Sequence, residues 1–509
     1  MKKTLFSILF SMLLVFQVSA QVDNTMYFMD RLPQSSWINP AQSPDCKFHI
    51  GGLLIPLFGQ LPPSMTFSLN IPLDYNDVIF HGEGEYADSL ITPLHPTANF
   101  DDFLKKMRKV NNFSTELQLD FLNFGFKAGE KSYVSFDLSE RMLFNFGLPR
   151  SLIEFAAKGN DVVRDADFTG LGVNVMDFHQ FAIGYKHDFS KKFSLGFRAK
   201  MLVGVADVHT KSSHLVLTTA EKTNYMRVES EYTVCTNVPL EVKLDEEGYV
   251  ENISMQSFDD QSVGKLITQY GVSTGSYGFA MDWGFASDIN SSLSCYFSIE
   301  DLGFIDWKRN AASFAIYDED SMRFEGVKVN DLDAGNFENV INLDSIVSNF
   351  NEITYTEGDY RTWLPAKFYL GAKYKVAKRM SLGALARFEL LPHSVRPSVT
   401  LSANFKPFKF TAATISYSYM DGNFSNLGLG FTVHPGPFQW YLVSDNLLGA
   451  VLFPTNTRSI GVKMGCNLVF GCVKKDKKHS RGKSQNSLTK KGKARNSSVI
   501  PYSNDNHKK

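Results

Sequence analysis

Apolar and polar side chains alternate along much of the chain, and the clearest example covers residues 193–206. Every second residue from Phe193 to Val205 is apolar, whereas the residues between them include Ser194, Arg198 and Lys200. Strict alternation predicts a β-strand with one apolar face. The alternation lasts 14 residues, longer than the roughly 5–6 of an ordinary strand. It is long enough for a tilted membrane strand, which needs about 9–11 residues.

The same period recurs in segments whose second face is mainly Gly, Ser, Asn, Thr and charge: 367–374, 382–390, 395–405, 411–419, 426–433 and 459–470. Roughly ten-residue alternating segments are typical of outer-membrane barrels. We therefore predict an all-β fold, a transmembrane antiparallel β-barrel of about 14 to 16 strands. The segments 46–55, 64–72 and 212–220 alternate least clearly. A soluble periplasmic or secreted β-protein is the alternative, although its strands would be shorter.

The connections between the predicted strands fall into two classes. Short turns are predicted at 128–130, 190–192, 288–291, 377–379, 406–407 and 434–436, and long connections at 73–114, 147–175, 236–274, 309–362 and 445–457. Counting back from the strand that ends at Phe470 places all of these short turns on one side and all of the long connections on the other. Outer-membrane barrels have short periplasmic turns and longer extracellular loops.

The first residues predict export. Lys2 and Lys3 precede an apolar stretch from Leu5 to Val18, and Val18-Ser19-Ala20 resembles a small-residue cleavage site. We interpret 1–20 as a secretory signal peptide, 21–45 as an N-terminal plug or periplasmic lead, and 46–470 as the barrel. Beyond Gln21 no run of 18 apolar residues occurs, which excludes spanning helices.

Charge separates the C-terminal tail from the rest. Residues 21–470 hold 38 Lys+Arg and 51 Asp+Glu, whereas residues 471–509 hold 12 Lys+Arg and 2 Asp. We predict that 471–509 is a disordered basic tail. Basic tails often bind nucleic acid, but an exported protein meets little of it, so we expect anionic envelope polymers, an acidic partner or no partner at all.

Candidate chemical motifs are few. Gly271 to Gly275 fits G-x-S-x-G, but the pattern runs into another strand instead of the helix that a nucleophile elbow requires. The stretch 310–360 holds 11 acidic residues without the spacing of a calcium loop. The histidines show no metal-ligand spacing: His187, His209, His214, His393 and His434. We expect no catalytic, cofactor-binding or metal residue, and no cofactor.

Two further features have structural readings. Pro149 to Lys158 is amphipathic, with Leu152, Ile153, Phe155 and Ala156 on one side and Gly159-Asn160 after it. This predicts a short helix in a loop or in the lumen, which either gates a ligand or only packs a loop.

The five cysteines leave at least one thiol unpaired, and one disulfide is compatible with their spacing: Cys46, Cys235, Cys295, Cys466 and Cys472.

Three short motifs carry a resemblance to a known family. They are Trp37-Ile38-Asn39-Pro40-Ala41, Phe146-Gly147-Leu148-Pro149 before Lys158-Gly159-Asn160, and the stretch from Tyr441 to Asn446 before the final strand. Over about 21–470 the chain resembles an uncharacterised outer-membrane β-barrel family of Bacteroidota, a domain of unknown function. More distantly it is similar to FadL-type channels and to PorV- and PorP-like barrels of the type IX secretion system. The resemblance implies 14 strands and a plug-like N-terminal segment, but no functional residue.

These observations favour a protein of the cell outer membrane, in contact with its lipid. The first hypothesis is a channel or transporter for small or hydrophobic solutes. The alternative is a non-transporting barrel that serves as scaffold or component of a secretion or surface machine. An outer-membrane hydrolase is disfavoured because no triad-like set converges, so we expect no enzyme. The sequence leaves the oligomeric state open.

We predict that the protein sediments with the outer membrane and migrates differently in gels with and without heating, as folded barrels do. The reason is the repeated alternation over segments long enough to span a bilayer. Membrane fractionation and gel electrophoresis test it. Recovery only in the soluble periplasmic fraction would contradict the barrel.

Overall fold

The computed structural model describes residues 23–44, 46–52, 64–160, 162–220, 226–256, 274–318, 353–391, 394–420 and 422–472. The expected signal peptide, residues 319–352 of the acidic stretch and the tail from 473 onward lie outside these ranges. Among the helices within them, none combines the length and apolar character needed to cross a bilayer.

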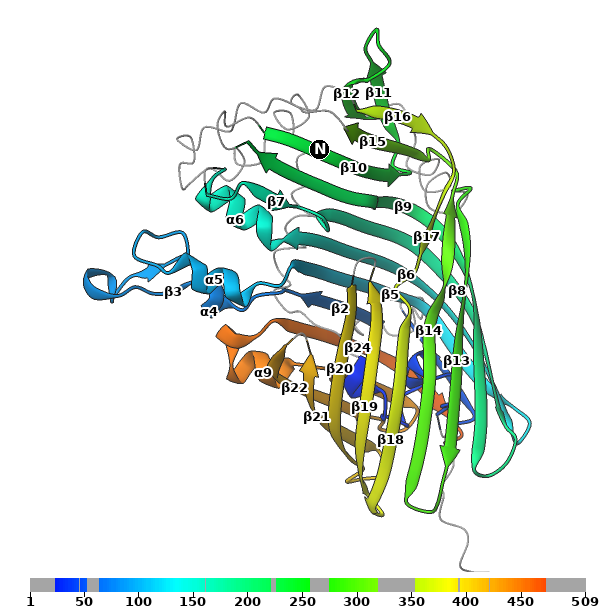
Figure 1. Ribbon diagram of the computed structural model, residues 1–509. Coiled ribbons are helices and arrows are strands. Elements are labelled where there is room, and N and C mark those ends of the chain that lie inside the picture. Colours follow the sequence, from blue (N-terminus) through cyan, green and yellow to red (C-terminus); the bar gives the residue numbers. More distant parts are fainter. Residues whose placement is uncertain are drawn as a thin grey trace, which may run out of the picture. The chain divides into compact units, whose positions relative to one another are not determined.

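Long antiparallel strands form the body of the molecule (Figure 1). They are β1 (Phe48–Gly51), β2 (Ser64–Asn70), β5 (Val110–Ala128), β6 (Ser132–Pro149), β8 (Gly172–Asp188), β9 (Phe193–Thr219), β13 (Tyr277–Asp288), β14 (Leu293–Trp307), β17 (Tyr360–Trp363), β18 (Lys367–Ala377), β19 (Met380–Leu391), β20 (Ser394–Phe405), β21 (Thr411–Met420), β22 (Asn423–Val433), β23 (Phe438–Ser444) and β24 (Ser459–Phe470).

The sheet closes on itself. β24 pairs with both β1 and β2, and each of these also pairs with β5, so β1 and β2 share one strand position. β17 and β18 likewise share a position beside β14. In the described residues the result is a closed antiparallel barrel of 14 strands, which confirms the predicted fold class. The segment 212–220 is not a strand of its own, because β9 continues through it to Thr219.

The short turns predicted from the sequence lie at one end of the barrel, and the described parts of the long connections lie at the other (Figure 1). We call these the turn end and the loop end. At the loop end β9 extends beyond the barrel, where it pairs with β7 (Asp165–Asp167) and with β10 (Met226–Thr236). β10 pairs in turn with β15 (Ala312–Asp318). β15 then pairs with β16 (Thr354–Glu357). Two hairpins complete this region, β3 (Phe80–His81) with β4 (Leu90–Ile91) and β11 (Leu240–Leu244) with β12 (Val250–Met255).

Short helices also gather at the loop end: α4 (Tyr75–Val78), α5 (Phe100–Lys106), α6 (Arg150–Lys158), α9 (Leu447–Leu452) and the 3-10 turns η2 (Gly84–Tyr86) and η6 (Pro454–Asn456). α6 confirms the helix predicted from 149–158. It ends at Gly159, whose φ of 74° lies in the left-handed region that favours glycine. Leu152 and Phe155 pack with Phe168 below the extended end of β9, so α6 lies in a loop and not in the lumen.

The predicted faces of the strands are also confirmed. On β9 the side chain of Leu195 is exposed on the outside, whereas Arg198 and Lys200 are buried inside. The outer wall is apolar over most of the circumference, with exposed side chains that include Ile183, Met201, Trp283, Phe297, Leu370, Leu382, Val399, Leu401, Ile415, Phe431 and Trp440. A barrel with an apolar outer wall and no sheet edge satisfies the requirements of a bilayer.

Depth along the outer wall should control the cost of a charge. Val399 and Val395 face outward on β20 with similar exposure, 54% and 56%, but Val395 lies near the loop end of the strand. We predict that Val399→Arg lowers the free energy of unfolding by about 2–4 kcal/mol and Val395→Arg by about 0–1 kcal/mol. Denaturant unfolding in phospholipid vesicles measures both. Equal losses would mean that β20 does not cross the bilayer at this depth.

Candidate functional site

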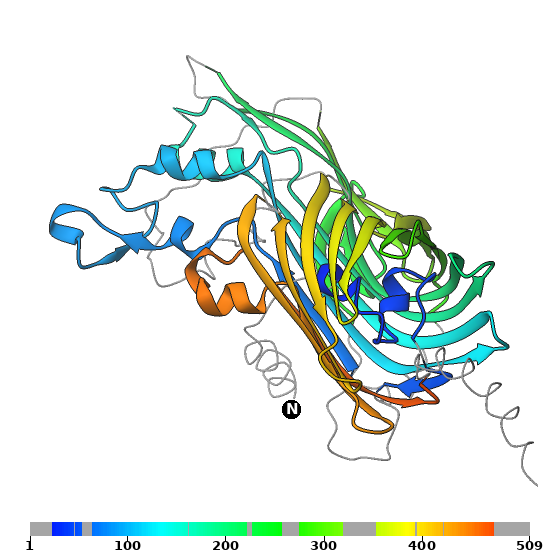
Figure 2. The same cartoon turned by 90° about the horizontal axis from the view of Figure 1, so that it is seen from below.

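The N-terminal segment, residues 23–44, lies inside the barrel (Figure 2). It contains two helical turns, α2 (Asp23–Met26) and α3 (Ser35–Ile38). Its apolar side chains pack with inward residues of β18, β19 and β23 in one cluster: Met26, Tyr27, Phe28, Met29, Leu32, Ile38, Tyr369, Leu385, Tyr441 and Val443. The segment therefore supplies the lumen with an apolar core that the strands alone do not have.

Hydrogen bonds tie this segment to strands on several sides of the lumen. The Tyr27 hydroxyl is 3.3 Å from the Ser298 hydroxyl on β14. The Gln34 amide donates to Asn467 Oδ1 on β24 at 2.9 Å. The Trp37 carbonyl accepts from Arg198 on β9 at 3.2 Å. A segment that reaches strands this far apart around the barrel blocks much of its cross-section.

Two glycines on the lumen face make room for the Asn-Pro-Ala motif. A Cβ atom at Gly196 would lie 2.0 Å from the Pro40 carbonyl oxygen, and one at Gly284 would lie 2.4 Å from Asn39 Oδ1. Asn39 Oδ1 also accepts the backbone N–H of Ala41 at 3.0 Å. The glycines of the alternating pattern thus allow a close approach of backbone to the sheet.

Charged contacts hold the start of the segment. Asp23 accepts hydrogen bonds from Lys367 Nζ and from the Tyr369 hydroxyl, both at 3.2 Å. Burial alone would raise the pKa of Asp23. The cations that face it, Lys367 foremost, outweigh this effect and lower the pKa to about 2. Asp445, just after β23, accepts the backbone N–H groups of Asn24 and Thr25 at 3.0 and 2.6 Å.

A second acidic residue secures the segment nearer the turn end. Asp30 accepts from Lys373 and from Lys406, each at 2.8 Å. Burial raises the pKa of Asp30, but these two lysines lower it more strongly, well below its usual range. The Asp30 side chain is 41% exposed, so solvent weakens these ion pairs relative to that of Asp23.

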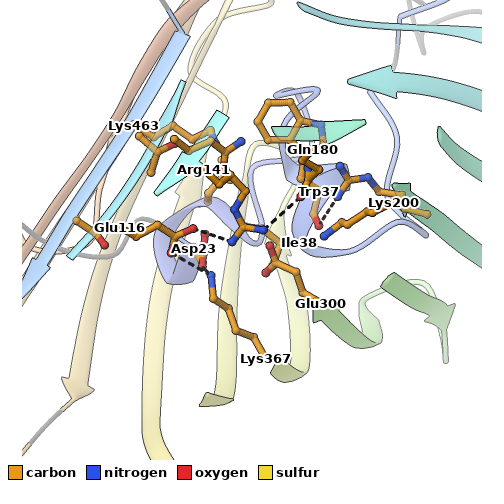
Figure 3. A pocket seen from close by; sticks show the side chains of 15 residues that line it. Asp23, Trp37, Ile38, Glu116, Arg141, Gln180, Lys200, Glu300, Lys367 and Lys463 are labelled. Atoms are coloured by element: carbon orange, nitrogen blue, oxygen red, sulfur yellow. Dashed lines mark hydrogen bonds and ion pairs between the residues drawn. The ribbon is translucent and has the colours of Figure 1, made fainter. Parts of the chain in front are cut away.

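Beside the segment, buried ion pairs cross the lumen in a connected series. Its contacts, all between 2.6 and 2.9 Å, are Glu116–Arg141, Arg141–Asp301, Asp301–Lys200, Lys200–Asp282, Asp282–Arg198 and Arg198–Asp137. We call this set the lumen ion network; Figure 3 shows its Glu116–Arg141 pair and the side chain of Lys200. Removing one partner from such a buried set costs about 3–5 kcal/mol, because a charge is left uncompensated.

The space that remains between the segment and the network is small. It is a cavity of about 30 Å³, lined by Asp23, Trp37, Ile38, Glu116, Arg141 and neighbouring residues (Figure 3). Such a volume admits water and nothing larger. Among the described residues, the N-terminal segment and the network together close the middle of the barrel.

A larger cavity of about 500 Å³ lies toward the loop end, and we call it the vestibule. Its lining combines apolar side chains with polar ones and comes from the loop-end halves of several strands: Leu143, Met176, Leu364, Pro365, Leu390, Ser114, Asn145, Asn174, His209 and Arg396. Arg396 donates to Ser114 Oγ on β5 at 3.0 Å, and His209 Nδ1 is 2.6 Å from Asn174 Oδ1. These bonds fix part of the polar side of the vestibule.

The structure brings few of the motif residues together. Residues 271–273 of the G-x-S-x-G match, His393 and most of the acidic stretch lie outside the described residues. His187, His214 and His434 lie apart from the vestibule, and within the described ranges no three His, Cys, Asp or Glu residues gather as metal ligands do. Cys46 and Cys472 are disulfide-bonded, whereas Cys235, Cys295 and Cys466 are free.

Sequence reasoning missed the lumen ion network and the role of Asp23. The sequence indicates only one side of these ion pairs: Arg198 and Lys200 lie on the polar face of an alternating strand. Their partners lie on other strands, and 101 residues separate Lys200 from Asp301.

We predict that Asp23→Asn loosens the N-terminal segment. It removes a charge-assisted hydrogen bond worth about 1.5–3 kcal/mol, so amide-exchange protection of residues 23–30 should fall about 10- to 100-fold. Since the pKa of Asp23 is lowered to about 2, wild type should keep this protection above about pH 4 and lose it as the pH falls toward 2. Exchange mass spectrometry, corrected for intrinsic rates, measures it.

Asp306→Asn is the matched control, because it breaks an exposed Asp–Arg pair at the loop end. It should leave residues 23–30 unchanged. Equal protection in wild type and Asp23→Asn would show that the Asp23 contacts do not hold the segment.

Comparison with known proteins gives a family and distant structural likenesses. No curated protein matches the chain. A FadL homologue of Pseudomonas aeruginosa is 9% identical, with 90% of this chain and 100% of that chain covered and a TM-score of 0.41. The toluene transporter TodX of P. putida is 9% identical, with 86% and 94% covered and a TM-score of 0.35. A family model matches residues 40–445, and the chain therefore belongs to that family, the family of unknown function DUF5723.

Proposed function

We propose that this protein is an outer-membrane channel or transporter for small, partly apolar solutes, with the N-terminal segment as its plug. The observation that carries the proposal is the vestibule of about 500 Å³, which opens among the loop-end halves of the strands and ends at the closed middle of the barrel. A site for entry thus lies directly before an obstruction that belongs to a separate segment of the chain.

The outer wall supports the membrane location. Its exposed side chains are apolar along strands of ten or more residues, and only closed barrels or helices can span a bilayer. We place the loop end outside the cell and the turn end in the periplasm, as short turns and long loops are distributed in outer-membrane barrels.

The vestibule suggests the class of solute. Its volume lies in the range of about 300–1,000 Å³ that holds drug-sized molecules. Leu143, Met176 and Leu364 offer an apolar surface, while Asn174 and His209 offer polar groups on the side of β8 and β9. A solute with an apolar body and one or two polar groups fits this combination.

Passage then requires movement of residues 23–44. The residual cavity of about 30 Å³ admits only water. Polar and charged contacts hold the segment, among them Asp23–Lys367 and Asp445 with Asn24 and Thr25. These contacts are non-covalent, and water can replace them. The segment can therefore leave the lumen without unfolding the barrel.

The alternative is a barrel that does not transport and instead serves as a scaffold of a secretion or surface machine, as the PorV- and PorP-like resemblance suggests. The lumen ion network favours it, because these buried pairs join strands across the lumen and none includes a residue of the N-terminal segment. Under this alternative the lumen stays closed when the segment is displaced.

Solute flux into liposomes separates the two functions. We predict that wild-type protein gives swelling rates in arabinose near those of protein-free liposomes, because the lumen is closed. The double variant Asp23→Asn/Asp445→Asn should swell at least about tenfold faster, since two sets of contacts of about 1.5–3 kcal/mol are weakened. A displaced segment, shown by amide exchange, without faster swelling would contradict transport and favour the scaffold.

Neighbouring residues of β6 provide a matched control for the pathway. Leu143 lines the vestibule, whereas Met142 is exposed on the outer wall. In the double variant, Leu143→Trp should slow the flux by narrowing the vestibule, and Met142→Trp should leave it unchanged.

A further inference from the structure

Exposed cations gather at the turn end of the barrel. Among the described residues of this end, eight are exposed: Lys47, Lys131, Lys191, Lys192, Lys375, Lys378, Arg379 and Lys409. They belong to the hairpins β5–β6, β8–β9, β18–β19 and β20–β21 and to the closing contact of β24 with β1. These positions lie on different sides of the barrel, so the cations form an interrupted ring and not a patch on one side. We call them the basic ring.

Acidic residues at the turn end are too few to neutralise the basic ring. Asp30, Asp188 and Asp288 are each bonded to a lysine or serine side chain. Glu130 is the remaining acidic residue of this end within the described ranges. The loop end differs, because exposed acids and cations lie side by side there, as in the Asp102–Lys105 pair of α5. The excess of positive charge is therefore a property of the turn end.

Exposed aromatic side chains accompany the basic ring. Six of them, between 39% and 60% exposed, lie in the same hairpins or at the end of β24: Phe126, Phe189, Tyr374, Phe408, Phe410 and Phe470. Outer-membrane barrels carry girdles of aromatic residues where the apolar band meets the lipid headgroups. Lysine and arginine side chains beyond such a girdle can keep their stems on apolar surface and extend their charges into the headgroup layer. The basic ring thus follows the border of the apolar outer wall.

We propose that the basic ring binds the headgroups of anionic phospholipids in the membrane leaflet at the turn end. This inference rests on the membrane location proposed above but not on the transport function. Lysine and arginine near a membrane surface attract anionic lipids, and at physiological salt the attraction reaches only about 8–10 Å. The cations at the border of the apolar wall satisfy this condition.

The ring shape favours lipid over an acidic protein as the partner. Lipids surround a barrel on all sides, whereas a protein that docks on the turn end covers one part of it. The cations are distributed over four hairpins and the closing contact of β24 with β1. The aromatic residues beside them supply the apolar contacts that acyl chains and headgroups at the border require.

A photocrosslinking experiment with defined lipids tests the proposal. Phe189 is 57% exposed and lies two residues before Lys191. The full-length protein, with p-benzoylphenylalanine in place of Phe189, is reconstituted in vesicles of equimolar phosphatidylglycerol and phosphatidylcholine, with one lipid radiolabelled at a time. We expect at least about threefold more phosphatidylglycerol than phosphatidylcholine in the crosslinks. The two yields should become nearly equal in Lys191→Gln/Lys192→Gln.

The loop end provides the matched control. Lys105→Gln/Lys109→Gln removes the same charge from side chains that are 75% and 78% exposed, and the preference at Phe189 should persist. At Trp283, exposed in the middle of β13, both lipids should crosslink equally. The heat-dependent gel shift confirms that each variant is folded.

Two results would overturn the proposal in a protein that floats with vesicles. Equal yields at Phe189 in wild type would favour an acidic protein as the partner instead. A preference that persists in Lys191→Gln/Lys192→Gln would mean that these cations do not hold the lipid. A folded protein that does not float would refute the membrane location and this inference with it.

Discussion

The pairing of the last strand with the first is the contact on which the rest of this structure depends. A β-sheet in lipid cannot leave an edge, because unpaired N–H and C=O groups have no water to bind. β24 closes the sheet by pairing with β1 and β2, which in turn pair with β5. Once closure fixes the register, the strict alternation of side chains decides which residues meet lipid and which meet the lumen.

Closure creates a second problem, which the inward face solves. A barrel of 14 strands has an interior too wide for its own side chains to fill with apolar contacts. Here the interior is occupied partly by ion pairs such as Arg141–Asp301 and partly by the N-terminal segment with Tyr27 and Phe28 at its centre. The ion pairs fill part of the interior with paired charges, so that no continuous apolar core is needed there. The N-terminal segment supplies the apolar core of the other part. The vestibule lies toward the loop end, and its lining includes no residue of the N-terminal segment.

The sequence predicted the barrel well because membrane strands obey a local rule. Alternation over Phe193 to Val205 is visible without knowing any neighbour, and turn lengths place the ends of the strands. The contacts of the candidate site were harder to predict from the sequence. The partners of Arg198, Lys200 and Asp23 depend on which strands face one another across the lumen, and local patterning does not contain that information. The histidines and the G-x-S-x-G match drew attention because their residue types are reactive. Of the histidines that the sequence singled out and the structure describes, His209 alone lines the vestibule.

The position of the N-terminal segment has a consequence for assembly. Asn24 and Thr25 bind Asp445, and Gln34 binds Asn467, across sequence separations of 421, 420 and 433 residues. The residues that are made first therefore find their partners only when the final strands are in place. Contacts of such long range are entropically expensive to close, so the N-terminal segment must wait in another conformation while the barrel forms. Until then its Met, Tyr and Phe side chains lack the apolar partners with which they pack in the closed barrel.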